Sequence, residues 1–231
     1  RVLARNGCEV VIPKEQICCG ALQVHAGVRD VAREVAERNL EAFGGEKLDA
    51  FVDHFGLEVE GLDVLDVGAS TGGFTDCLLQ RGAASATCID VGRAQLHPRL
   101  AVEPRVTNLE QINARNLKMG DLPYDAYDLI VIDVSFISLK QVLQPVWMFL
   151  KPGGLLVALV KPQFEAPRTQ IERGGRVSDE AARAAVAQQI KHAAAKRGFV
   201  LRSEMDCPIA GARAGNVEIL LLFRLENAGA S

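Results

Sequence analysis

The chain has 231 residues, of which 48% are hydrophobic and 24% charged, enough for one well-packed core with an appendage. No apolar run approaches the roughly 20 residues of a membrane helix, and no signal peptide opens the chain, which disfavours membrane and secreted proteins. The net charge of −3 is not that of a generally basic nucleic-acid-binding protein, although a local basic patch would suffice to bind nucleic acid. We expect a cytoplasmic protein that, starting at Arg1 rather than Met, is a fragment or a processed chain.

The first 43 residues contain few strong patterns. They predict a short strand at 10–13 and a helix from about residue 28 to 43, which Gly44 and Gly45 end. Glu46–Phe55 predicts a further helix. We therefore place a boundary near Gly44, with 1–43 as a partial segment that is not an independent domain and 44–231 as the main domain.

From residue 64 onward, short apolar runs alternate with helical patterns. The predicted strands are 64–67, 86–91, 105–109, 127–133, 155–160, 200–205 and 217–225. The predicted helices are 75–81, 139–150 and 179–197, the second closed by Lys151-Pro152-Gly153-Gly154 and the third capped by Ser178 or Asp179. This alternation predicts an α/β fold with a mostly parallel, doubly wound sheet, and the last two strands form an antiparallel edge pair.

Four ionisable residues lie at the carboxyl ends of predicted strands: Asp66, Asp90, Asp133 and Lys161. Ligands of parallel sheets bind beyond these strand ends. The four side chains are therefore expected to converge on one rim of the sheet.

The segment Val64–Thr75 joins an apolar strand to a helix through a loop rich in small residues. Ser70 stands where a dinucleotide-binding loop has its middle glycine, and Asp66 suits the ammonium and sulfonium of S-adenosylmethionine better than a pyrophosphate. Asp90 is placed to accept hydrogen bonds from two ribose hydroxyls. The alternative is that both acids cap turns and the glycines only permit tight packing. The combination favours S-adenosylmethionine, bound by Asp66, Gly68, Ser70, Thr71, Gly72, Gly73, Phe74 and Asp90.

Five sequence blocks follow one another in a fixed order along the main domain. They are Asp-Val-Gly-Ala-Ser-Thr-Gly-Gly-Phe-Thr-Asp-Cys-Leu-Leu, Ile-Asp-Val-Gly-Arg-Ala-Gln-Leu, Asp-Val-Ser-Phe-Ile-Ser-Leu, Val-Lys-Pro-Gln-Phe-Glu and Gly-Asn-Val-Glu. These blocks resemble the TlyA (hemolysin A) family, which groups with the FtsJ/RrmJ-like ribose 2′-O-methyltransferases. The resemblance covers about residues 44–225 and implies a Rossmann-like methyltransferase that acts on ribosomal RNA or ribosomal subunits.

The resemblance also implies a catalytic Lys-Asp-Lys-Glu tetrad. By motif, its members are Lys47, Asp133, Lys161 and Glu218. The family usually has Ser-Arg before the Gly-Gly that precedes the first lysine, and this chain has Ala42-Phe43 there.

A ribose hydroxyl is a poor nucleophile until it begins to lose its proton, and Lys161 is the candidate base if burial and a neighbouring cation lower its pKa. Lys47 is the candidate cation, and Asp133 and Glu218 would orient the two lysines while stabilising their charged forms. The alternative is a pair of buried salt bridges. A cation between an apolar strand and a proline is costly without a partner, which favours the catalytic interpretation.

Three arginines, Arg168, Arg173 and Arg176, lie in the polar loop after Lys161. With Lys151, Arg99 and Arg213 they are candidates for the local positive surface that binds RNA. The alternative is a solvated loop, and proximity to Lys161 favours the RNA interpretation.

The front of the chain resembles the Cys-Cys-Gly segment of cysteine-rich domains in iron–sulfur subunits of glycolate oxidase and heterodisulfide-reductase-like proteins. Cys18, Cys19 and Gly20 carry the resemblance, with Cys8 and His25 as weak further candidates. A closed metal site needs four ligands, so we expect a truncated remnant or gene fusion and no metal. Three more cysteines lie in apolar settings, Cys77, Cys88 and Cys207, and no disulfide framework is predicted.

Three alternative functions stay open. One is a metal or iron–sulfur redox module led by Cys18 and Cys19. Another is a cytolytic activity, as the family's older name suggests, and the third is methylation of a small molecule.

Overall fold

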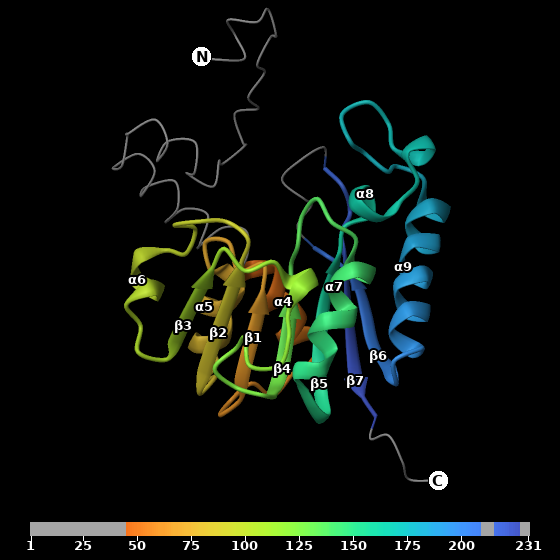
Figure 1. Cartoon of the computed structure of the whole chain (residues 1–231). Helices are drawn as coiled ribbons and strands as arrows, with labels where there is room; N and C mark the ends of the chain where they lie inside the picture. Colours follow the sequence, from red (N-terminus) through yellow and green to blue (C-terminus); the bar gives the residue numbers. More distant parts are fainter. Residues whose placement is uncertain (1–44, 209–214, 227–231) are drawn as a thin grey trace, which may run out of the picture.

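The computed structural model describes residues 45–208 and 215–226 (Figure 1). The predicted strand at 10–13, the helix at 28–43 and the Cys-Cys-Gly segment lie outside these residues. The residue-44 boundary falls at their edge and stays a prediction.

A seven-stranded sheet forms the centre of the described part, in the order β3-β2-β1-β4-β5-β7-β6. The first five strands in this order are parallel, and β7 runs antiparallel to both β5 and β6. The bounds are β1 Asp63–Val67, β2 Ser85–Asp90, β3 Val106–Glu110, β4 Tyr127–Ile132, β5 Leu150–Val160, β6 Phe199–Asp206 and β7 Ile219–Leu225. The predicted mostly parallel sheet with an antiparallel edge pair is confirmed.

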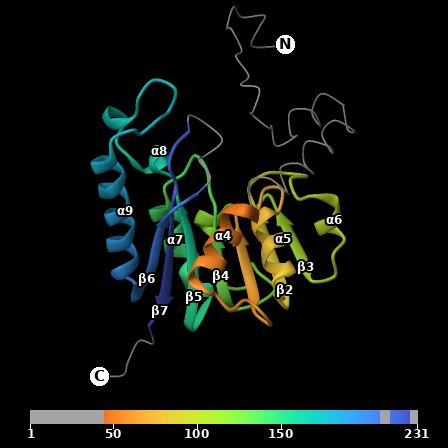
Figure 2. The same cartoon turned by 180° about the vertical axis from the view of Figure 1, so that it is seen from behind.

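Helices cover both faces of the sheet. Figure 1 shows α7 and α9 on one face, and Figure 2 shows α4 and α5 on the other. Each face buries its own apolar cluster, because these strands are apolar on both sides. The bounds are α4 Gly45–Phe55, α5 Gly73–Gln80, α6 Pro98–Ala101, α7 Leu139–Val146, α8 Pro162–Glu165 and α9 Glu180–Ala195, with short 3₁₀ turns η2 Ala114–Asn116, η3 Trp147–Phe149 and η4 Arg168–Gln170.

One predicted helix is wrong at its end. The helix expected to reach Leu150 ends at Val146, because Pro145 cannot donate a helical hydrogen bond and the chain tightens into η3. Leu150 already pairs with Tyr127 of β4, and the Lys151–Gly154 stop signal forms an irregularity inside β5. Gly154 is required there, since an added Cβ would lie 2.8 Å from the Lys151 carbonyl oxygen.

The long C-terminal helix begins as expected. The Asp179 side chain accepts a hydrogen bond from the Ala181 N–H at 2.9 Å and is the N-cap of α9. Among the described residues, no helix is long and apolar enough to cross a membrane.

Candidate active site

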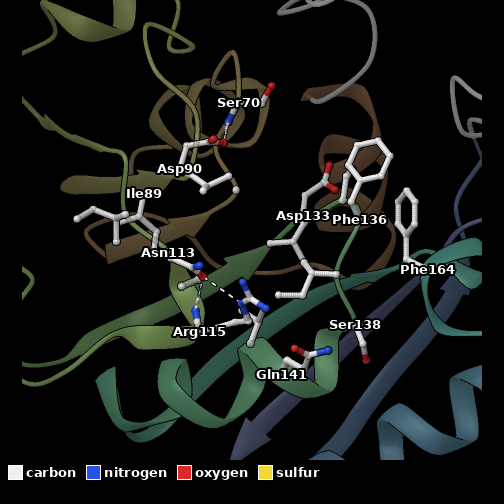
Figure 3. A pocket seen from close by; sticks show the side chains of 18 of the residues that line it. Ser70, Ile89, Asp90, Asn113, Arg115, Asp133, Phe136, Ser138, Gln141 and Phe164 are labelled. Carbon is white, nitrogen blue, oxygen red and sulfur yellow. Dashed lines mark hydrogen bonds between the residues drawn. The ribbon is translucent and has the colours of Figure 1, made fainter.

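A cavity of about 790 Å³ opens at the carboxyl ends of β1, β2 and β4, where Asp90 and Asp133 lie (Figure 3). Small-molecule sites commonly have volumes of roughly 300–1,000 Å³. In Figure 3, Ser70 and Asp90 lie on one side of the cavity, and Asp133, Phe136 and Phe164 on another. The expected convergence of Asp90 and Asp133 on one rim is therefore seen.

The loop after β1 forms one wall of this cavity through tight backbone contacts. Gly68 has a φ of +86°, and an added Cβ would lie 2.3 Å from the Asp133 carbonyl oxygen. Ser70 also adopts a left-handed φ of +48°, so it takes the conformation that usually favours glycine. The Asp90 carboxylate accepts hydrogen bonds from the Ser70 N–H at 2.9 Å and the Gly92 N–H at 2.6 Å. Asp90 thus orders the two loops that frame the cavity.

The other predicted cofactor residues lie beneath the loop and not on the cavity wall. Thr71, Gly72, Gly73 and Phe74 are buried, and Phe74 belongs to the core under α5. Gly72 is required by packing, because an added Cβ would lie 2.3 Å from Leu100 Cδ1. The roles of these four residues in cofactor binding stay predictions, and packing accounts for their burial.

Asp66 is fully buried below the loop, with 1% of its surface exposed. Its Oδ2 accepts a hydrogen bond from the Thr75 hydroxyl at 2.6 Å, while its buried Oδ1 has no hydrogen-bond partner among the described residues. Burial raises the pKa of this carboxyl to about 7, with smaller increases from the charges of Asp133 and Asp90. Asp66 is not on the cavity wall, so direct contact with a ligand ammonium stays a prediction.

The four tetrad residues form two ion pairs next to the cavity. Lys47 Nζ donates to Glu218 Oε2 at 2.6 Å, and both side chains are buried. Lys161 Nζ pairs with Asp133 Oδ1 and donates to Ser135 Oγ at 3.0 Å. The structure brings together all four residues that the resemblance selected.

Strand register explains why these pairs are neighbours. Val160 of β5 pairs with Ile219 of β7, so the adjoining Lys161 and Glu218 lie side by side at the strand ends. Lys47 reaches Glu218 from α4, where it shares a buried helical face with Leu48, Phe51 and Val52. With Asp133 at the end of β4, the tetrad is thus assembled by four elements, α4, β4, β5 and β7.

The pKa of the Lys161 ammonium is raised above the ordinary value of 10.5. Burial by itself lowers this pKa, but the charges of Asp133 and Glu218 raise it by more. This direction is opposite to the lowered pKa that a catalytic base would require according to the sequence-based hypothesis. Lys161 is a cation at neutral pH until its surroundings change.

Sequence reasoning missed the aromatic part of the wall. Phe136 follows Asp133 with a φ of +65° and is 74% exposed, and its ring lies 5.0 Å from that of Phe164. A bulky residue rarely adopts a positive φ, and such outliers gather at functional sites. In the sequence, each phenylalanine stands three residues after a charged strand-end residue, and this shared spacing is the signal that could have identified the pair.

A second missed feature holds the aromatic pair in place. The Glu165 carboxylate of α8 accepts hydrogen bonds from the Ser138 hydroxyl at 2.6 Å and the Leu139 N–H at 2.5 Å. It thereby ties the loop after β4 to the segment after β5. Another part of the wall comes from the segment after β3, where Asn113 Oδ1 accepts a hydrogen bond from the Arg115 N–H at 3.1 Å.

The predicted RNA-binding arginines are exposed on the segment 168–178, which we call the arginine loop. Arg168, Arg173 and Arg176 form no ion pair with a described residue. Two other residues expected to add to this positive surface form ion pairs. Lys151 lies near the opposite end of β5 and pairs with Asp128 at 2.8 Å, and Arg99 pairs with Asp76 at 2.9 Å. Arg213 lies outside the described residues.

The cysteines in the described part of the chain are buried thiols: Cys77, Cys88 and Cys207. Burial raises the pKa of both Cys77 and Cys88 to about 12, so these thiols are unreactive. No group of three or more potential ligands for a metal ion occurs within 45–208 and 215–226. The Cys18–Cys19 hypothesis falls outside this range.

Comparison with known proteins identifies relatives of the described part. The model of the FtsJ-like methyltransferase family matches residues 42–224. Over 191 residues the chain is 39% identical to the 16S/23S rRNA (cytidine-2′-O)-methyltransferase TlyA of Mycobacterium tuberculosis, covering 83% of this chain and 70% of that protein. Over 178 residues it is 39% identical to the rRNA methyltransferase-like YqxC of Bacillus subtilis, covering 77% of this chain and 63% of that protein. The chain thus spans less than two thirds of the length of YqxC.

Solved structures show the same fold. A hemolysin-like protein of Lactococcus lactis superposes with a TM-score of 0.75 at 38% identity, covering 79% of this chain and 87% of that one. An S-adenosylmethionine-dependent methyltransferase of Listeria monocytogenes shares the fold with a TM-score of 0.59 at 17% identity, covering 79% and 99%.

The front of the chain has different relatives. The model of a cysteine-rich domain family matches residues 1–54. Over 56 residues the chain is 41% identical to a glycolate oxidase iron–sulfur subunit of Bacillus subtilis, covering 24% of this chain and 13% of that protein. Both resemblances predicted from the sequence are thereby confirmed, and the two family matches overlap at residues 42–54, which include most of α4.

Proposed function

The chain belongs to the FtsJ-like methyltransferase family, and on this premise we propose that it methylates the 2′-hydroxyl of a ribose in ribosomal RNA, with S-adenosylmethionine as methyl donor. The observation that carries the proposal is the Lys161–Asp133 pair at the edge of the cavity, with Lys47–Glu218 beside it. A ribosomal RNA substrate implies a cytoplasmic site of action.

The residues at the cavity fit the donor. Gly68 leaves a cradle that a Cβ would fill, and Asp90 presents a carboxylate to the cavity beside Ser70. We propose that Gly68, Ser70 and Asp90 hold the cofactor directly and that Asp66 supports the loop from beneath through Thr75. When bound, S-adenosylmethionine would supply its sulfonium methyl group to an aligned nucleophile, and the sulfur would leave as a neutral thioether.

Lys161 is proposed to accept the proton of the ribose hydroxyl. Asp133 and Ser135 hold its Nζ at the cavity edge, which orients the nitrogen towards a bound nucleotide. Glu218 neutralises the neighbouring Lys47 and keeps that cation within the tetrad. Because the pKa of Lys161 is raised, its ammonium must first lose a proton to solvent before it can act as a base.

This order of events predicts a pH-dependent rate. Below the pKa of Lys161, the single-turnover rate should rise about tenfold per pH unit, since only the neutral amine accepts a proton. In Asp133→Asn, loss of the largest cause that raises this pKa should shift the profile to lower pH, although the maximal rate falls. Single-turnover rates between pH 6 and 10 measure both effects, with Asp125→Asn, an exposed carboxylate, as control. A rate independent of pH in the wild type would show that Lys161 stays a cation throughout.

The aromatic pair favours a nucleotide over a small substrate. An exposed phenyl ring next to the reacting pair offers a stacking surface for a base, and stacking contributes about 1–3 kcal/mol per base. We predict that Phe136→Ala lowers kcat/KM for RNA by at least about tenfold, while Phe136→Tyr retains most of it. An equal loss in both variants would contradict stacking. Binding of S-adenosylhomocysteine, measured by calorimetry, shows whether the cofactor cavity is intact.

The decisive test uses labelled S-adenosylmethionine with whole ribosomal subunits and with naked ribosomal RNA. The proposal expects label in RNA and a 2′-O-methylated nucleoside after digestion. A base-methylated nucleoside would remove the ribose assignment. Label only in small molecules would favour the small-molecule alternative.

The other two alternatives have direct tests. A redox module led by Cys18 and Cys19 requires bound iron or another metal, which Cys18→Ser would remove. A cytolytic activity requires lysis of erythrocytes by the purified chain. We expect neither result, because the Cys-Cys-Gly segment offers too few ligands for a closed metal site and the proposed activity is methyl transfer.

A further inference from the structure

Asn216 is a buried amide that the proposed mechanism does not use. It lies two residues before Glu218, and 1% of its surface is exposed. Its Oδ1 accepts a hydrogen bond from the Val177 N–H at 2.9 Å, and its Nδ2 donates to the Gly175 carbonyl at 3.0 Å. One side chain thus binds the backbone on both sides of Arg176.

The segment that Asn216 binds is the arginine loop. The loop is closed by backbone hydrogen bonds from the Glu172 N–H to the Arg176 carbonyl at 2.8 Å and from the Gly175 N–H to the Glu172 carbonyl at 3.0 Å. Gly174 and Gly175 both have positive φ, and an added Cβ on either would meet no atom within 4 Å. The tip of the loop therefore has open space around it. The buried residue of the loop is Val177, which is 1% exposed.

The same short segment also holds the reaction centre. Glu218 binds Lys47 and lies beside Lys161, while Asn216 binds the arginine loop. Two residues of chain span at most about 7 Å. This stretch is buried at both Asn216 and Glu218. It therefore fixes the distance between the backbone of the arginine loop and the tetrad.

We propose that Asn216 is a positioning residue that fixes the arginine loop relative to the tetrad, so that an RNA phosphate bound by Arg173 and Arg176 brings its ribose to Lys161. This inference rests on the proposed RNA substrate. An amide suits this role because its carbonyl oxygen accepts and its NH₂ group donates hydrogen bonds in one plane. Alanine supplies neither, and it changes no charge.

The test compares Asn216→Ala with the wild type, using the full chain and Asn108→Ala on the exposed edge strand β3 as matched control. Trypsin cleavage after Arg173 and Arg176, followed by mass spectrometry, reports loop order without any RNA. We expect cleavage at these sites to accelerate about tenfold in Asn216→Ala only. Should this variant fail to fold by circular dichroism, Asn216→Ser takes its place.

The second measurement is ribosomal RNA affinity across a series of salt concentrations. Loss of two phosphate contacts should lower the slope of log K against log salt by about 1.4, although the substitution removes no charge. A purely structural defect would not change this slope. Unchanged cleavage, or faster cleavage with an unchanged slope, overturns the inference. If the wild type binds no RNA but Asn216→Ala is cleaved faster than the wild type, the proposed RNA substrate is wrong, while the role of Asn216 in holding the arginine loop stands.

Discussion

Lys161→Ala is expected to lose at least about 1,000-fold in methyl transfer to RNA while it retains binding of S-adenosylhomocysteine. A positioned general base contributes roughly 10²–10⁴-fold, and this substitution also leaves Asp133 without its ion-pair partner. Lys161 does not line the cavity, so the cofactor contacts should persist. Single-turnover transfer of labelled methyl and calorimetry of S-adenosylhomocysteine binding measure the two properties separately.

Lys118→Ala is the matched control for Lys161→Ala, because Lys118 is exposed and forms no ion pair with a described residue. Its rate should equal that of the wild type. A wild-type rate in Lys161→Ala would exclude Lys161 from the mechanism. A loss of cofactor binding that parallels the loss of rate would instead assign Lys161 to the cofactor cavity.

Asp66→Asn is expected to become more stable relative to the wild type as the pH rises. The pKa of the Asp66 carboxyl is about 7 in the folded protein, against the ordinary value of 3.8. The folded state therefore binds more protons between these values, and Asp66 lowers the free energy of unfolding as the pH rises through this window. Above pH 7 the full effect is about 4 kcal/mol, and below pH 4 it vanishes because both states are protonated.

The Asn side chain also lowers the free energy of unfolding at all pH values. Oδ1 of Asp66 has no hydrogen-bond partner among the described residues, so an amide nitrogen at that position would find no acceptor. An unsatisfied buried group costs about 1–3 kcal/mol. The informative quantity is therefore the free energy of unfolding of Asp66→Asn minus that of the wild type. This difference should increase by about 2–3 kcal/mol between pH 5 and pH 8. Urea unfolding at both pH values measures it.

Asp125→Asn provides the reference for this experiment, because Asp125 is exposed and its substitution should change stability little at either pH. A difference for Asp66→Asn that does not change with pH would show that Asp66 is ionised in the folded protein at pH 5. Such a result would favour an early, direct role for its charge in binding the cofactor ammonium.

Much of the site follows from sequence because parallel strands share one direction. Asp90, Asp133 and Lys161 were each predicted at a strand end, and the strands β2, β4 and β5 do carry them to one rim. Lys47 and Glu218 came from the family resemblance alone, since 171 residues separate them and no periodicity links them. The end of α7 was predicted too late, because Pro145 weakens the helix before the stop signal and Leu150 already pairs with Tyr127 in the sheet.

The sequence by itself therefore determined the α/β sheet, the family and the residues available for chemistry, because hydrophobic periodicity and motif order are local properties of the chain. Only the tertiary structure decided that Asp66 is buried beneath its loop, that Phe136 stands exposed at the cavity, and that the pKa of Lys161 rises. Burial and pKa depend on distances between residues far apart in the chain. Those distances exist only once the strands have paired.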